Sequence, residues 1–173
     1  MATRKPPPPA TDDAWRALQL QFDLVKHAET KAAATLASCG VLGGLLYSLV
    51  SQNKTGGVLF AVLASVTAVA IVTAATAAGL ALRPRLFRRE TGQNLLFYSA
   101  IAHRFGHDAE AFGREFSVLL ADRPAMLAAL SGQVLSNANV ATRKYRATNV
   151  AIITLLVALG LMAATATIGL TGW

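Results

Sequence analysis

The longest uncharged stretch of the sequence is the feature that most limits what this chain can fold into. It runs from Thr55 to Leu82, 28 residues without one charge. A helix needs about 20 apolar residues to cross a lipid bilayer. The run ends at a basic cluster formed by Arg83, Arg85, Arg88 and Arg89. This order is typical of a membrane span with a basic flank, and it predicts a membrane protein.

Two further uncharged stretches predict two further spans. The first covers residues 32–53, and the other begins at Ala147 and continues to Trp173. We expect transmembrane helices at residues 32–50, 57–82 and 150–170, joined between the first two by a short polar turn. Trp173 would then lie at a membrane interface, where aromatic rings are favoured.

The distribution of basic residues predicts the topology. The net charge is +7, and ten of the 16 basic residues lie in residues 83–149, with five more in residues 1–31. Because cytoplasmic segments are enriched in Lys and Arg, we expect the N-terminus and residues 83–149 in the cytoplasm and the C-terminus in the periplasm, as in a bacterial inner-membrane protein. Topology and lipid head groups account for most of this charge, so no nucleic-acid partner is predicted.

The segment before the first span predicts a helix that continues into the membrane. Residues 1–11 contain four consecutive prolines and predict a disordered arm. Residues 12–31 then carry an apolar stripe at helical spacing: Trp15, Leu18, Phe22 and Val25. No Gly or Pro separates this amphipathic helix from the first span, so both are expected to form one helix. A helix lying on the membrane surface is the alternative.

The segment between the second and third spans, residues 83–149, predicts a small helical head. Pro84 starts a break, and helical periodicity resumes near Thr91. Gly106 interrupts the pattern, and the turn Asp122–Pro124 starts a long helix that shows no stop signal before the third span. The predicted fold is an all-α membrane protein with three transmembrane helices and a small cytoplasmic helical head, its first and last spans continuous with head helices.

Several basic residues directly flank the predicted spans on the cytoplasmic side. Arg83, Arg85, Arg88 and Arg89 are interpreted as membrane-interface anchors. Lys31 and Lys144 lie on helices that continue from the head, so anchoring and ligand binding remain equal alternatives for them. Arg143 lies at the same predicted depth, and all of these cations can converge there. Glu29 stands near Lys31 and suggests an ion pair.

The sequence offers little that indicates catalysis or a cofactor. His103 and His107 have the i, i+4 spacing of a metal pair, but Gly106 is expected to end the helix between them, so no metal site is predicted. No phosphate-binding loop, nucleophile motif or convincing pair of carboxylates is present. We therefore expect neither an enzyme nor a cofactor.

Short motifs in a fixed order resemble a known family. They are His27-Ala-Glu-Thr-Lys31 before the first span, Arg83-Pro84 after the second, Asn94-Leu-Leu-Phe97, and Lys144-Tyr145 before the third. Their order and the span layout resemble the Pycsar transmembrane effectors of bacterial anti-phage defence. The resemblance implies that infection triggers synthesis of cyclic UMP or cyclic CMP, and that the effector responds by impairing the inner membrane. The proline arm has no counterpart in that pattern.

A cyclic pyrimidine mononucleotide needs a basic group for its phosphate and a ring for its base. Lys31, Lys144 or Arg104 can supply the first, and Phe97, Tyr98 or Tyr145 the second. The competing interpretation places the three aromatic rings in the core of the head. The predicted nucleotide-binding residues are Lys31, Glu29, Asn94, Phe97, Arg104, Lys144 and Tyr145.

The functional hypothesis is an effector whose head senses the nucleotide and whose spans impair the membrane, by rearrangement of a homo-oligomer in the bilayer. Small residues in the spans (Gly40, Gly44, Ala74, Ala75 and Ala78) are expected at the subunit contacts, although tight helix contacts within one subunit are an equal alternative for the glycines. The alternative function is a membrane-anchored protein-interaction module. A constitutive small channel is a third possibility.

Overall fold

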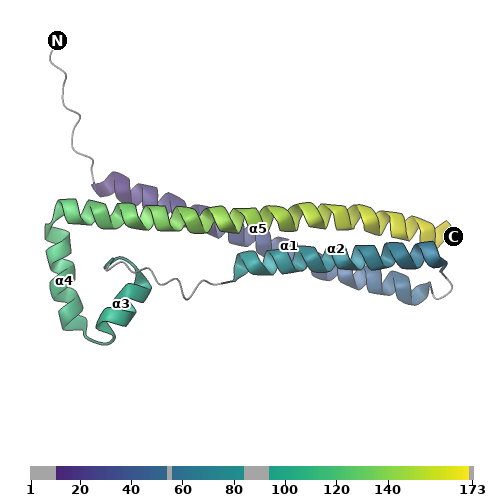
Figure 1. The fold of residues 1–173 in the computed structure, drawn as a ribbon, viewed down its shortest axis with the longest axis horizontal. Coiled ribbons are helices and arrows are strands. Elements are labelled where there is room, and N and C mark those ends of the chain that lie inside the picture. Colours follow the sequence, from purple (N-terminus) through teal and green to yellow (C-terminus); the bar gives the residue numbers. More distant parts are fainter. Residues whose placement is uncertain (1–10, 54–55, 84–93, 172–173) are drawn as a thin grey trace, which may run out of the picture. The chain divides into compact units, whose positions relative to one another are not determined.

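The computed structural model describes residues 11–53, 56–83 and 94–171, and every regular element in these ranges is a helix. The helices are α1 (Thr11–Gln52), α2 (Val58–Leu82), α3 (Tyr98–Phe105), α4 (Ala109–Ala121) and α5 (Arg123–Thr171) (Figure 1). The predicted all-α fold is confirmed. The proline-rich residues 1–10, Pro84 and the basic residues Arg85, Arg88 and Arg89 lie outside the described ranges.

The two longest helices have no break where the sequence predicted continuity. α1 contains 42 residues and α5 contains 49, which correspond to about 63 and 74 Å at 1.5 Å per residue. Residues 26–36 and 142–152 are helical throughout. α1 also includes Thr11, which the sequence had assigned to the arm, a difference of one residue at a helix end.

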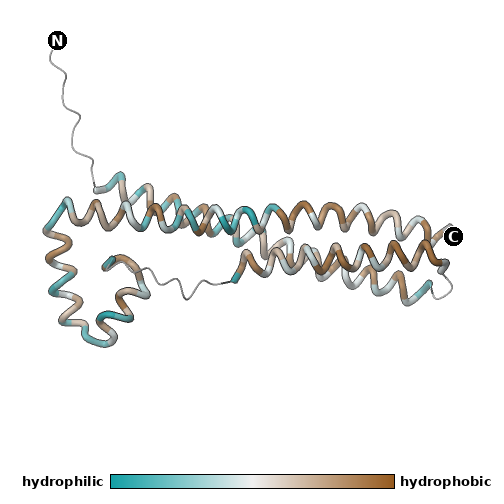
Figure 2. Tube along the Cα trace, in the orientation of Figure 1, coloured by the Kyte–Doolittle hydropathy of each residue, from teal (hydrophilic) through white to brown (hydrophobic). Residues whose placement is uncertain are grey.

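Three of the helices are long and apolar enough to cross a membrane: α1, α2 and α5. Figure 2 shows the apolar residues concentrated along α2 and along the C-terminal part of α5. Among the described residues these are the three spans that the sequence predicted.

The chain divides into two compact units. We call residues 11–25 and 94–141 the head unit, and residues 26–53, 56–83 and 142–171 the span unit. α1 and α5 each contribute one end to the head unit and the other to the span unit.

The core of the span unit follows a repeat of seven residues on all three helices. The buried positions of α2 alternate steps of four and three: Phe60, Ala64, Thr67, Ile71, Ala74, Ala78 and Ala81. The buried positions of α1 in this unit do the same: Ala28, Ala32, Thr35, Cys39, Leu42 and Leu46. On α5 the buried series is Lys144, Thr148, Ala151, Ala158 and Thr165. This is the spacing of a left-handed coiled coil.

Small residues in the spans are used differently from the sequence prediction. Ala74 and Ala78 are 0% exposed inside the span unit of a single chain, so they are not available for contacts between subunits, and that prediction is wrong for both. Gly40 and Gly44 are exposed, and a Cβ atom at either would meet nothing within 4 Å. Tight contact within one chain therefore does not explain these two glycines.

The core of the head unit forms where α1 and α5 meet. Leu18, Met126 and Leu130 are buried there, and Ala14, Leu96, Leu119 and Val134 pack against them. Trp15 and Phe22, which the sequence placed on the same stripe as Leu18, are 39% and 53% exposed. The predicted stripe is therefore only partly buried.

Local capping explains the helix ends of the head unit. Gly106 ends α3 with a φ of 54°, a conformation that favours glycine. The Asp108 side chain accepts a hydrogen bond from the Ala111 amide at the start of α4, and Asp122 does the same for Ala125 at the start of α5. The Asn94 carbonyl accepts from the Phe97 amide, so the chain turns there and α3 begins at Tyr98. Thr91, near which helical periodicity was predicted to resume, lies outside the described residues.

Candidate functional site

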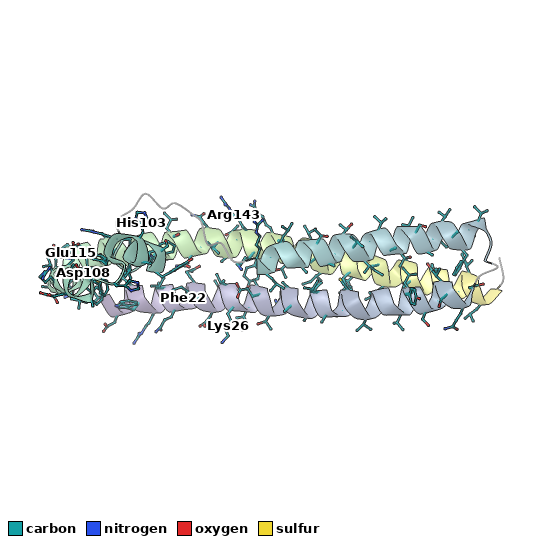
Figure 3. The ribbon with its side chains drawn as sticks, turned by 90° about the horizontal axis from the view of Figure 1, so that it is seen from below. Phe22, Lys26, His103, Asp108, Glu115 and Arg143 are labelled. Carbon is teal, nitrogen blue, oxygen red and sulfur yellow. The ribbon has the colours of Figure 1, made fainter. Side chains whose placement is uncertain are left out.

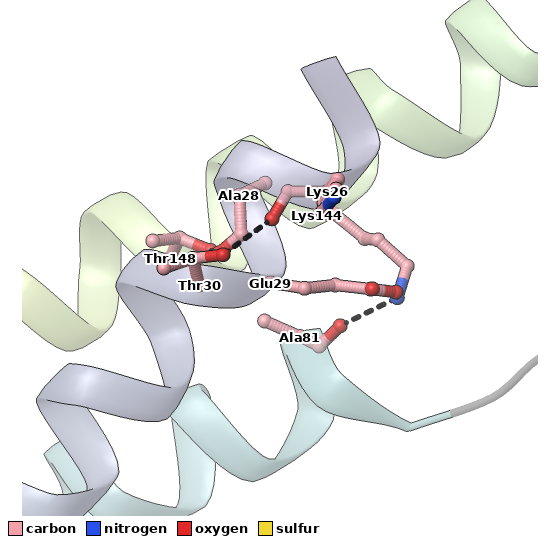
Figure 4. A network of polar contacts seen from close by, with 7 residues as sticks. All are labelled: Lys26, Ala28, Glu29, Thr30, Ala81, Lys144 and Thr148. Atoms are coloured by element: carbon pink, nitrogen blue, oxygen red, sulfur yellow. Dashed lines mark hydrogen bonds and ion pairs between the residues drawn. The ribbon is translucent and has the colours of Figure 1, made fainter. Parts of the chain in front are cut away.

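An ion pair joins α1 and α5 within the span unit. The Lys144 ammonium donates a hydrogen bond of 2.5 Å to a carboxylate oxygen of Glu29 (Figure 4). The Lys144 side chain is 6% exposed, whereas the Glu29 side chain is 43% exposed. The positive charge is therefore inside the bundle, and its carboxylate partner reaches the surface.

The same ammonium also contacts the end of α2. Lys144 Nζ donates a second hydrogen bond, of 2.9 Å, to the carbonyl oxygen of Ala81. Carbonyl groups in the last turn of a helix lack partners within the helix and carry partial negative charge, so a cation is favourable there. We call Glu29, Lys144 and the Ala81 carbonyl the clamp. One buried charge in the clamp joins all three helices of the span unit.

Small side chains let the helices approach next to the clamp. Ala28, one residue before Glu29, is 0% exposed, and its carbonyl oxygen accepts a hydrogen bond of 3.4 Å from the Thr148 hydroxyl. Thr148 lies one helical turn after Lys144 and is itself 1% exposed. The backbones of α1 and α5 are therefore close at this level.

The clamp matters because burying a charge without partners is costly in free energy. A buried ammonium is tolerated when charged and polar partners surround it, whereas removing one partner leaves an uncompensated charge. Lys144 has both a carboxylate and a carbonyl. If Glu29 moves away, the Ala81 carbonyl is the clamp partner that remains for Lys144.

The other candidates in the span unit do not join the clamp. Lys31 is exposed on α1, and Tyr145 is half-buried on α5. Arg143 is also exposed and is labelled in Figure 3. Of the predicted junction cations that the structure describes, Lys144 is buried while Lys31, Arg83 and Arg143 are exposed. The roles that the sequence suggested for these four residues therefore remain predictions. They are Lys31, Arg83, Arg143 and Tyr145.

The remaining candidates lie in the head unit, where each has a structural partner. The Asn94 amide donates 2.8 Å to the Ala129 carbonyl of α5, and its side-chain oxygen accepts from the Leu96 amide. Phe97 precedes α3, and its ring centroid lies 5.1 Å from that of Tyr98.

Arg104 is engaged by a carboxylate. It forms an ion pair with Glu115 that joins α3 to α4, with a closest N–O distance of 2.6 Å, and both side chains are 41% exposed. Its guanidinium also lies 5.2 Å from the Phe105 ring centroid. Figure 3 labels Glu115 together with His103 and Asp108. Because α3 ends at Phe105, His103 and His107 do not share a helix. This agrees with the prediction that Gly106 ends the helix between them.

Two polar groups escaped the sequence reasoning. The Ala81 carbonyl belongs to a residue with no functional side chain, and only its place in the last turn of α2 marks it as a hydrogen-bond acceptor. Gln133 is 3% exposed in the head unit, and its side-chain nitrogen has no hydrogen-bond partner among the described residues. A glutamine within an apolar helical stripe is the sequence signal that marks this position.

Comparisons with known proteins agree with this layout of helices. The family model of the Pycsar effector protein domain matches residues 13–171. The Pycsar effector protein PtPycTM of Propioniciclava tarda is 32% identical over 138 residues, which cover 79% of this chain and 68% of that protein. No solved structure shows a significant match. The chain therefore belongs to the Pycsar effector family and is a transmembrane effector of anti-phage defence.

Proposed function

We propose that the protein is an inner-membrane effector that senses cyclic UMP or cyclic CMP through its head and then impairs membrane integrity by rearrangement of a homo-oligomer. The family assignment over residues 13–171 is the observation that carries this proposal. The distribution of basic residues supports an orientation with the N-terminus and residues 83–149 in the cytoplasm. The effector acts as a binding protein and not as an enzyme.

The continuity of α1 and α5 supports a mechanical route from sensing to the membrane. Each helix belongs to both the head unit and the span unit. A ligand shifts a conformational equilibrium only by its different affinity for the two states. A change that the ligand favours in the head unit can therefore reach the spans along helices that contain no joint.

Calorimetry and vesicle leakage test the two parts of the proposal. The purified full chain is titrated with cyclic UMP, cyclic CMP and cyclic AMP, and we expect a pyrimidine nucleotide to bind. The same chain in dye-loaded vesicles should release dye when that nucleotide is added. Binding without dye release contradicts membrane impairment, and dye release that is equal with and without any nucleotide contradicts sensing.

A membrane-anchored interaction module is the second candidate function. Replacing the spans by an unrelated membrane anchor separates the two functions. An interaction module keeps its activity after this replacement, whereas the proposed effector loses it completely.

A further inference from the structure

The three helices of the span unit contain few features that fix their relative positions in lipid. In a bilayer, lipid tails compete with apolar side chains, so an apolar seam holds helices together less strongly than it does in water. Much of the buried seam consists of alanine, including Ala28, Ala32, Ala74, Ala78 and Ala151. Directional polar contacts between helices are therefore the specific restraints in this unit.

The clamp differs from the other polar contacts between these helices. Thr67 and Thr165 join α2 to α5 through neutral hydroxyl groups, and Asn53 donates to the Gly169 carbonyl of α5. The clamp is the contact among those described that carries a charge and joins α1, α2 and α5 at once. It also lies where both long helices enter the span unit, since Glu29 follows Val25 by four residues and Lys144 follows Ala141 by three.

We propose that the clamp is an autoinhibitory device that holds the span unit in its inactive arrangement, and that membrane impairment requires Glu29 and Lys144 to separate. This inference rests on the proposed membrane impairment, but it does not depend on which ligand triggers the change. It assigns the clamp a regulatory function in place of the predicted direct contact with a nucleotide.

Because the Lys144 ammonium contacts both α1 and α2, its movement breaks both contacts together. Glu29 is the accessible partner, at 43% exposure, so a change on the outside of the bundle acts on it first. Once the carboxylate leaves, the buried Lys144 charge keeps only the Ala81 carbonyl of its two clamp partners, which favours its movement toward water or another anion. That movement also withdraws the ammonium from the Ala81 carbonyl, so α1 and α2 lose their charged contact with α5 together.

Substitutions in the clamp test the proposal without any nucleotide. The full chain is placed in dye-loaded phosphatidylethanolamine–phosphatidylglycerol vesicles, and basal dye release is measured. Loss of a hydrogen bond to a charged group changes an equilibrium by about tenfold or more, so E29A should raise basal release by about that factor and E29Q by less. Circular dichroism verifies that each variant keeps its helix content.

The matched control is an exposed ion pair of the head unit. Glu110 and Arg114 on α4 form an ion pair with side chains 86% and 67% exposed, so E110Q repeats the chemical change of E29Q at a site that restrains nothing. E110Q should leave basal release unchanged. Equal basal release from E29A, E29Q and the wild type overturns the proposal.

A charge exchange distinguishes the clamp from a simple ion pair. E29K/K144E restores attraction between α1 and α5, but it places a carboxylate beside the Ala81 carbonyl, where both groups accept hydrogen bonds. We expect this double variant to release dye as E29A does. Basal release at the wild-type level in E29K/K144E overturns the three-helix clamp.

The nucleotide response of the wild type is measured in the same vesicles, and it separates the two hypotheses. If the wild type responds to a cyclic pyrimidine nucleotide while E29A and E29Q have the basal dye release of the wild type, the proposed function is retained and the clamp is refuted. Elevated basal release from E29A, with a wild type that no nucleotide activates, supports the clamp and refutes the proposed ligand.

Discussion

Thr67 of α2 and Thr165 of α5 face each other inside the span unit, with their hydroxyl oxygens 3.1 Å apart and both side chains 0% exposed. Each hydroxyl also lies within hydrogen-bond distance of a carbonyl of its own helix, Thr67 of Leu63 and Thr165 of Leu161. A hydroxyl has one hydrogen to donate, so two hydrogens serve three contacts. One hydroxyl therefore gives up its own carbonyl whenever the two helices are joined.

Because of this competition, the pair should contribute little to stability. Interhelical hydrogen bonds in membranes average about 0.6 kcal/mol, and the Thr67–Thr165 bond also costs one contact within a helix. We expect T67V and T165V each to lower the unfolding free energy in mixed micelles by less than about 1 kcal/mol. T67V/T165V should be no less stable than either single variant, and a clearly larger loss in the double variant would contradict this account.

Gly169 near the end of α5 is expected to be intolerant of a side chain. A Cβ atom there would lie 2.9 Å from the Asn53 side-chain nitrogen and 3.1 Å from a ring carbon of Phe60. Overpacking of this kind costs about 1–3 kcal/mol, so G169A should destabilise the span unit and weaken the Asn53 hydrogen bond to Gly169. Chemical unfolding in micelles measures the loss.

Gly160 on the same helix provides the matched control, because a Cβ atom there would meet nothing within 4 Å. G160A should be neutral or stabilising, since alanine favours a helix interior by up to about 1 kcal/mol over glycine. Equal losses in G160A and G169A would show that the close approach at Gly169 is not the cause.

Gln133 should be replaceable by an apolar residue at a gain in stability. Its side-chain nitrogen is buried and has no partner in the part of the chain that the structure describes, and an unsatisfied buried donor costs about 1–3 kcal/mol. Q133L should therefore stabilise the head unit by about 1 kcal/mol in thermal unfolding. The exposed Gln19 on α1 is the control, since Q19L should change stability by less than about 0.5 kcal/mol. Destabilisation by Q133L would mean that the amide has a partner in solution.

The sequence predicted the features of the fold that depend on strong local signals. The uncharged run before Arg83 indicated the second span, Gly106 indicated the end of α3, and Asp122–Pro124 indicated the start of α5. The absence of a breaker between the amphipathic helix and the first span predicted the continuity of α1. Each signal is a property of a few neighbouring residues, so it can be recognised without tertiary contacts.

Features set by the rotation of helices about their axes could not be predicted. Every residue of α2 is apolar or a small hydroxyl residue, so the sequence offers no contrast to show that Ala74 is buried and that its neighbour Ala75 is not fully so. Glu29 and Lys144 were placed at one depth from their distance to the spans, but their contact depends on how α1 and α5 face each other. The turn that precedes α3 at Tyr98 follows from the Asn94 contacts, which periodicity does not reveal.

Substitution of Arg104 tests one of the predicted nucleotide-binding residues. It should change protein stability little, so a change in nucleotide affinity can be interpreted directly. Its ion pair with Glu115 is 41% exposed on both sides, so R104A should change the unfolding free energy by less than about 1 kcal/mol. If Arg104 binds the phosphate of a cyclic nucleotide, R104A should weaken calorimetric binding by tenfold or more, because a charge-assisted hydrogen bond contributes about 1.5–3 kcal/mol. E115Q is the informative control, since it removes the competing carboxylate and should tighten binding if Arg104 is the phosphate ligand. Unchanged affinity in both variants would exclude Arg104 from the nucleotide site.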